Sequence, residues 1–138
     1  MSAAADALTT AEIVDLITDF AQQPKAVDLV VLDLSSASAF TDAFVIATGR
    51  SDRQVKAIHD AIHQGMKNEH AMLPSHVEGL AEASWVLLDY GDVVVHVFTP
   101  ATREYYRLET LWGEVPRRTI ASGEPEPTEG LADDDATA

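Results

Sequence analysis

Apolar residues recur at intervals of three and four along three segments of the chain, which is the spacing that buries one face of a helix. These segments span roughly residues 9–23, 51–69 and 99–113. The third begins with Thr99 as N-cap and Pro100 at the first helical position, and Gly113 ends it. Two begin with a capping box, formed by Thr9 with Glu12 and by Ser51 with Gln54. The stripes expected to be buried are Ile13, Leu16, Ile17 and Phe20, then Val55, Ile58, Ile62 and Met66, then Tyr105, Leu108, Leu111 and Trp112.

Short apolar runs between these helices predict the strands. Leu29–Leu34 and Ala43–Thr48 are short, mainly apolar runs of the kind that form central strands, and Trp85–Tyr90 and Val93–Phe98 indicate a hairpin closed at Gly91. The segment His76–Gly79 gives a weaker strand signal. The order of elements predicts an α+β fold, with a mixed β-sheet of about five strands packed with three helices.

The hairpin has two different faces, and either two-residue turn at Gly91 gives the same assignment of residues to them. One face is purely aliphatic and is expected to be core: Val86, Leu88, Val93, Val95 and Val97. The other mixes aromatic, aliphatic, acidic and imidazole groups: Trp85, Leu87, Asp89, Val94, His96 and Phe98. Such a mixture suits a face that helices cover only in part, or one that meets a partner.

Composition divides the chain into a folded domain, residues 1–115, and a tail, residues 116–138, that is rich in Pro, Gly, Glu and Asp. The tail carries six acidic and two basic residues and is predicted to be disordered. The whole chain has a net charge of −14, most of which therefore belongs to the folded domain. A field of this sign repels nucleic-acid phosphates and anionic lipids, so we expect no autonomous nucleic-acid binding and no membrane binding.

Cysteine is absent, which excludes thiolate metal sites, disulfides and a cysteine nucleophile. The first residues lack the basic and apolar regions of a signal peptide, and no run approaches the length of about 18 apolar residues that a membrane span needs. These features predict a cytoplasmic protein.

Candidate chemistry is sparse, and we expect no enzyme activity, no cofactor and no metal site. The turn Gly49–Arg53 could hold a phosphate at a helix start, but it has a single glycine. His59 and His63 have the spacing of zinc ligands on a helix, but Asp60 stands where a metallopeptidase has Glu. On the third helix the side opposite the stripe carries Arg103, Tyr106, Arg107 and Thr110, which suits either a solvated face or an interface.

Four segments in order resemble the ribosomal silencing factor family, RsfS, also called Iojap-related. They are TDAFVIATGRSDRQVKAI (residues 41–58), VEG (77–79), WVLLDYGDVVVHVF (85–98) and REYYRLETLWG (103–113). The resemblance covers roughly Val27 to Val115. It implies a homodimer whose fold is like a degenerate nucleotidyltransferase domain without that fold's catalytic signature.

The resemblance also implies a function: binding to ribosomal protein fourteen of the large ribosomal subunit, which blocks joining of the small subunit and represses translation under nutrient limitation. An acidic domain suits such a basic partner. The matching segments, sorted by the faces assigned above, give the residues that we expect at the contact: Trp85, Leu87, Asp89, Tyr90, Asp92, His96, Arg103 and Tyr106. The alternative is a nucleotide-binding module that holds phosphate at Gly49–Arg53, with Asp89 and Asp92 as metal ligands.

Overall fold

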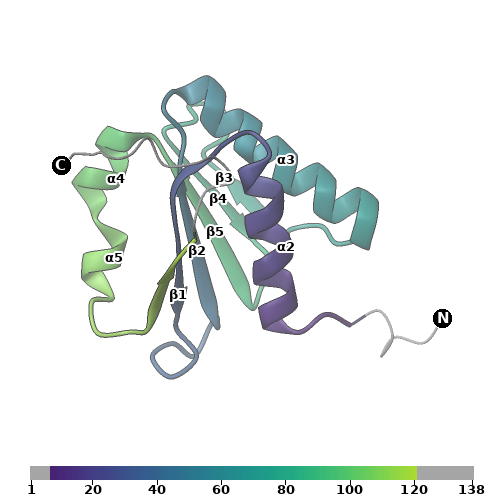
Figure 1. Ribbon diagram of the computed structural model, residues 1–138, viewed down its shortest axis with the longest axis vertical. Helices are drawn as coiled ribbons and strands as arrows, with labels where there is room; N and C mark the ends of the chain where they lie inside the picture. The colour runs from purple at the N-terminus through teal and green to yellow at the C-terminus, as the bar shows by residue number, and fades with distance from the viewer. Residues whose placement is uncertain (1–6, 121–138) are drawn as a thin grey trace.

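A mixed sheet of six strands lies at the centre of the molecule, in the order β3-β4-β5-β2-β1-β6 (Figure 1). The computed structural model describes residues 7–120. Strands β2 and β5 pair in parallel, and the other neighbours pair antiparallel. This confirms the predicted α+β fold and its mixed sheet. The strands are β1 (Val27–Asp33), β2 (Ala43–Thr48), β3 (His76–Glu78), β4 (Trp85–Asp89), β5 (Val93–Phe98) and β6 (Arg117–Thr119).

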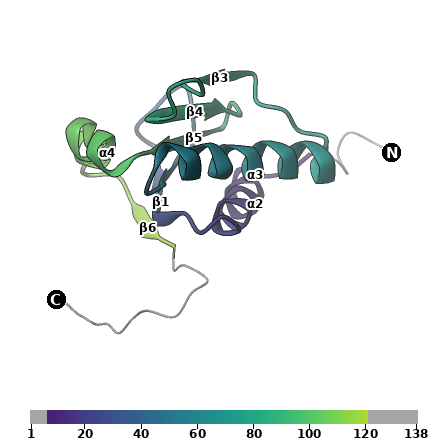
Figure 2. The same cartoon turned by 90° about the horizontal axis from the view of Figure 1, so that it is seen from above.

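Helices cover both faces of this sheet. Helices α2 (Thr10–Gln22) and α3 (Asp52–His70) lie on one face, and α4 (Pro100–Tyr106) and α5 (Leu108–Leu111) lie on the other (Figures 1 and 2). The capping box of Thr9 and Glu12 starts α2, as predicted. At the start of α3 the Ser51 side chain accepts from the Gln54 N–H, as predicted. The Gln54 side chain accepts from the backbone N–H of Arg50 and not from that of Ser51, so the reciprocal half of the predicted capping box is not formed.

The main core lies between the sheet and the helix pair α2–α3. The aliphatic face of the β4–β5 hairpin points into this core, as the sequence predicts. On that face Val86 pairs with Val97, and Leu88 pairs with Val95. The hairpin closes tightly at Gly91, whose φ of +87° favours glycine. Its N–H donates to Asp89 Oδ1 at 2.8 Å. The predicted helix stripes fill the rest of the core, with Ile17, Ile58, Ile62 and Met66 fully buried.

Gly65 sets the close approach of α2 and α3. A Cβ at this position would lie 2.5 Å from the ring of Phe20, which is itself buried. Gly65→Ala is therefore expected to lower the free energy of unfolding by about 1 kcal/mol, even though alanine favours helix more than glycine does. Urea unfolding followed by circular dichroism measures this.

The exposed neighbour Gln64 offers a matched control, because Gln64→Ala changes the same helix without a clash. Adding Phe20→Leu to Gly65→Ala should recover part of the loss. A Gly65→Ala protein as stable as Gln64→Ala would contradict close packing at this crossing.

A second, smaller core lies on the opposite face, beneath α4 and α5. Leu32, Leu34, Ile46 and Phe98 are fully buried there. The partly buried residues packed around them are Val30, Phe44, Trp85, Leu108, Trp112 and Val115. The mixed face of the hairpin is thus covered at its Trp85 and Phe98 end, while Leu87, Asp89 and Val94 stay half-buried.

The predicted third helix is broken into α4 and α5. Arg107 adopts a left-handed conformation with φ +50° and separates them. This turns the chain, so one apolar stripe cannot continue through both segments. Leu108 and Trp112 pack into the second core as expected, but Tyr105 and Leu111 are 79% and 76% exposed, so their assignment to the buried stripe was wrong.

The sheet continues past the predicted domain end at Val115. Arg117–Thr119 forms β6, which pairs with β1, and the Ile120 N–H donates to the Leu29 carbonyl. The prediction that the disordered tail starts at residue 116 is therefore wrong for residues 117–119. An edge strand held by backbone hydrogen bonds needs no apolar pattern, so composition could not reveal it. Residues 121–138 of the predicted tail lie outside the described residues.

Candidate functional site: an aromatic surface on the hairpin and α4

Aromatic rings link the end of the β4–β5 hairpin to α4. The Trp85 ring lies 5.0 Å from the Phe98 ring and 4.7 Å from the Tyr106 ring, measured between centroids. The Tyr106 ring in turn meets the Tyr105 ring edge-on at 4.9 Å. Trp85 is half-buried, Tyr106 is 50% exposed and Tyr105 is 79% exposed. We call Trp85, Tyr105 and Tyr106 the aromatic surface.

Tyr105 belongs to this surface but was not among the predicted contact residues. The spacing of the third segment placed it in the buried stripe. The break at Arg107 is what exposes it. A left-handed residue other than glycine has a weak sequence signal, so the sequence offered little means of finding Tyr105.

His96 lies beneath the aromatic surface. It is 4% exposed, and its Nδ1 accepts a hydrogen bond of 3.1 Å from Trp85 Nε1. Burial lowers the pKa of His96 to about 4, so the ring is neutral near pH 7. His96 is one of the predicted contact residues, and the structure places it behind Trp85 rather than at the surface.

Leu87 and Asp89 extend the same face of the sheet toward its β3 edge. Leu87 pairs with Glu78 and Asp89 pairs with His76, so Glu78 and Asp89 add acidic groups on the side of Trp85. Leu87 and Asp89 are half-buried, and Glu78 is exposed. The aromatic surface therefore has an aliphatic and acidic border along β4 and β3.

Tyr90 and Asp92 lie apart from this surface. Tyr90 packs against the main core, and burial raises the pKa of its hydroxyl to about 12. The carbonyl of Asp92 accepts from the backbone N–H groups of Asp42 and Ala43, and these hydrogen bonds link the start of β2 to the hairpin turn. The structure thus places Trp85, Leu87 and Asp89 on one face of β4, with Tyr106 against Trp85. Tyr90 packs toward the main core, and Asp92 lies in the hairpin turn.

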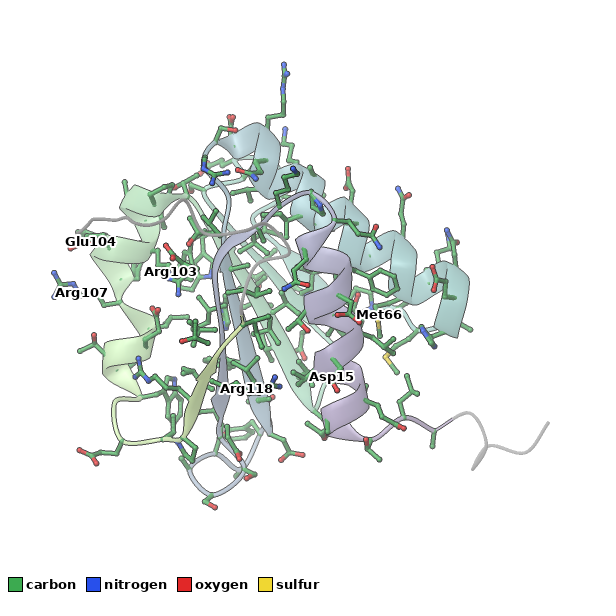
Figure 3. The ribbon with its side chains drawn as sticks, viewed as in Figure 1. Asp15, Met66, Arg103, Glu104, Arg107 and Arg118 are labelled. Carbon is green, nitrogen blue, oxygen red and sulfur yellow. The ribbon has the colours of Figure 1, made fainter. Side chains whose placement is uncertain are left out.

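Arg103 is not an exposed cation but is largely buried, and it links α4 to the sheet as a clamp. Its side chain is 13% exposed and points from α4 toward the sheet (Figure 3). Nη1 donates to the Asp28 carbonyl at 2.6 Å and to Thr48 Oγ1 at 2.7 Å. Nη2 pairs with Glu109 Oε2 at 2.5 Å. Burial alone would raise the pKa of Glu109, but hydrogen bonding and the charge of Arg103 outweigh it and lower this pKa.

A cavity of about 670 Å³ opens between α4–α5 and the β1–β6 edge of the sheet. Its walls include Arg103, Arg107 and Arg117. Each of these cations already binds a protein oxygen: Arg107 pairs with Glu104, and Arg117 donates to the Glu109 carbonyl. The cavity therefore belongs to the clamp that holds α4 and α5 on the sheet.

The features that suggested nucleotide or metal binding have structural roles. A Cβ at Gly49 would lie 2.7 Å from the Val55 nitrogen, so close packing accounts for this glycine. The carboxylate of Asp89 accepts from the turn at Gly91. His59 Nδ1 contacts Asp60 Oδ1 at 2.9 Å. Across residues 7–120, no group of three or more His, Cys, Asp or Glu side chains is arranged to hold a metal ion.

Among the described helices, none has the length and apolar character needed to cross a membrane.

Comparison with known proteins confirms the resemblance found in the sequence. The family model described as "Ribosomal silencing factor during starvation" matches residues 7–138. Ribosomal silencing factor RsfS of Bacillus subtilis is 46% identical over 99 residues, covering 72% of this chain and 83% of the relative. The RsfS of Zymomonas mobilis is 39% identical over 101 residues, covering 73% and 75%.

A solved structure agrees with these relatives. The crystal structure of a protein from Chromobacterium violaceum superposes with a TM-score of 0.75 at 34% sequence identity, covering 86% of this chain and 98% of that one. Sequence and fold lead to the same assignment, and the chain belongs to the ribosomal silencing factor family.

Proposed function

We propose that this protein binds ribosomal protein fourteen on the large ribosomal subunit and thereby prevents the small subunit from joining. Membership in a family described as silencing the ribosome during starvation supports a role in repressing translation when nutrients are limiting. The mechanism is steric: a bound protein occupies a surface that the other subunit needs. Such a mechanism needs no covalent bond to be made or broken.

The aromatic surface is the observation that carries this proposal. Tyrosine and tryptophan dominate the energetics of protein interfaces, because they bury a large area at a small cost in side-chain entropy. Here Trp85 and Tyr106 are held in place by packing, yet both keep exposed area. The acidic border at Asp89 and Glu78, within a chain of net charge −14, favours a basic partner.

Oligomeric state is part of the same proposal. We infer from the family resemblance that the free protein is a homodimer. Sedimentation of the purified protein alone and in the presence of large subunits would show which form binds the ribosome.

A subunit-joining experiment tests the proposed function directly. Purified large and small subunits are mixed under joining conditions with and without the protein, then separated on a sucrose gradient. The expected result is that the protein sediments with the large subunit and that fewer joined particles form. Binding to neither subunit at modest salt would overturn the proposal. The nucleotide-binding alternative would then be tested by the melting temperature with nucleotide and Mg²⁺.

Tyr106→Ala is expected to weaken binding to the large subunit about tenfold, because it removes exposed aromatic area next to Trp85. Binding is measured by cosedimentation over a range of protein concentrations. The control is Phe40→Ala: Phe40 is 92% exposed but lies in the loop between β1 and β2, at the other end of the sheet. Equal losses in the two variants would contradict the assignment of the contact to the aromatic surface.

A further inference from the structure

His96 occupies a place where a hydrocarbon ring would pack without difficulty. It stands on β5, diagonal to Trp85 on β4, because Trp85 pairs with Phe98 and His96 pairs with Leu87. Aromatic rings surround it: Phe44 edge-on at 4.5 Å, Phe98 stacked at 6.1 Å and Trp85 at 6.0 Å. A phenylalanine ring could make the same ring contacts, so they do not require an imidazole at this position.

The hydrogen bond from Trp85 determines which nitrogen of the His96 ring carries the proton. An indole N–H can only donate, so Nδ1 of His96 must carry the lone pair, and the single proton of the neutral ring is on Nε2. Nε2 is buried and has no hydrogen-bond partner among the described residues. A buried N–H without a partner costs stability. A phenylalanine would avoid this cost, so packing alone does not explain the histidine.

The remaining role of the imidazole is the one its Nδ1 performs. We propose that His96 is a positioning residue for partner binding, because it accepts the Trp85 indole N–H and fixes the orientation in which Trp85 joins the aromatic surface. The inference deepens the proposed binding to the large subunit and rests on it for its functional consequence. The hydrogen bond itself can be examined without the ribosome.

Fixing Trp85 in advance reduces the ordering cost of binding. A half-buried indole that is free to rotate would have to be immobilised on contact, and holding one such side chain in place improves affinity by about three- to tenfold. Tyr106 covers Trp85 from the α4 side, and His96 holds its nitrogen from the sheet side. Both contacts favour the orientation that the indole has in the structure.

Nuclear magnetic resonance tests the geometry. The chain has two tryptophans, so a ¹⁵N-labelled sample shows two indole N–H signals, from Trp85 and Trp112. In the wild type, the Trp85 proton is expected to exchange with water slowly. In His96→Phe, it should exchange at least tenfold faster while the Trp112 signal is unchanged. His96→Asn, whose Oδ1 can accept in place of Nδ1, should restore most of the protection.

The binding arm uses the same variants. His96→Phe is expected to weaken large-subunit binding about three- to tenfold, and His96→Asn to recover most of it. In a Trp85→Phe background, which has no indole N–H, His96→Phe should cause no further loss. An unchanged Trp85 signal in His96→Phe, or unchanged binding despite a changed signal, would overturn the proposal.

Two further outcomes remain informative. If the wild type binds no subunit, the proposed function fails, while the resonance data still decide whether His96 holds Trp85. If His96→Phe does not fold, the imidazole ¹⁵N shifts of the wild type decide it. A proton found on Nδ1 instead of Nε2 would overturn the hydrogen bond on which the inference stands.

Discussion

Arg103→Ala is expected to lower the free energy of unfolding by about 3 kcal/mol. The substitution leaves the carboxylate of Glu109, which is 21% exposed, without its partner, and removing one member of a partly buried ion pair costs part of the several kcal/mol that a fully buried pair would lose. It also removes the donor to the Asp28 carbonyl and to Thr48 Oγ1, so α4 loses its connection to β1 and β2. Urea denaturation followed by tryptophan fluorescence measures the change.

Arg107 provides the matched control for Arg103. It lies one turn further along, faces outward, and pairs with Glu104 through side chains that are 62% and 75% exposed (Figure 3). Exposed pairs of this kind contribute little, so Arg107→Ala should change stability by no more than about 0.5 kcal/mol. Arg103→Lys should lose nearly as much stability as Arg103→Ala, because an ammonium cannot make the same fork of hydrogen bonds. Similar losses for Arg103→Ala and Arg107→Ala would refute the clamp.

The second large effect is a loss of stability on mild acidification. Burial lowers the pKa of His96 from the usual 6.5 to about 4, so between these values the unfolded chain binds a proton that the folded protein does not. The stability that the neutral ring provides is complete above pH 6.5 and is lost as the pH falls toward 4. Between pH 7 and pH 5 the expected loss from His96 is about 2 kcal/mol.

His96→Phe should remove most of this pH dependence. The pKa of His63 is also lowered, chiefly by partial burial and then by the charges of His59 and Lys67, which gives a smaller effect in the same direction. The carboxyls of Asp33 and Glu109 have lowered pKa values and affect stability mainly below this window. Unfolding free energies at pH 7, 6 and 5 test the assignment. An unchanged slope in the variant would show that another group is responsible.

Much of the fold could be predicted because its signals are local. A capping box spans four residues, and a hairpin closed at glycine determines which strand residues share a face. The starts of α2 and α3, and the common face of Val86 and Val97, follow from such short-range patterns. The same alternation correctly separated the aliphatic core residues of the hairpin from the mixed face that carries Trp85 and His96.

The candidate site was harder to predict because it depends on contacts between distant segments. Arg103 reads as a surface cation on a helix, and its burial depends on Asp28 and Thr48, which lie 75 and 55 residues away in the chain. His96 shares a face with Trp85, but alternation cannot show which residue is covered. The exposure of Tyr105 depends on the backbone conformation of Arg107, a single residue with no distinctive sequence signal.

The short strand β6 has a consequence for handling the protein. Through Val30, Val31 and Leu32 it occupies the outer edge of β1, a strand that is apolar on both faces. A fragment cut at Val115, where composition changes, would leave the hydrogen-bonding groups of that edge open. Open edges of apolar strands template aggregation. We therefore expect a fragment cut at Val115 to aggregate more readily than a chain that keeps Arg117–Thr119 paired with β1.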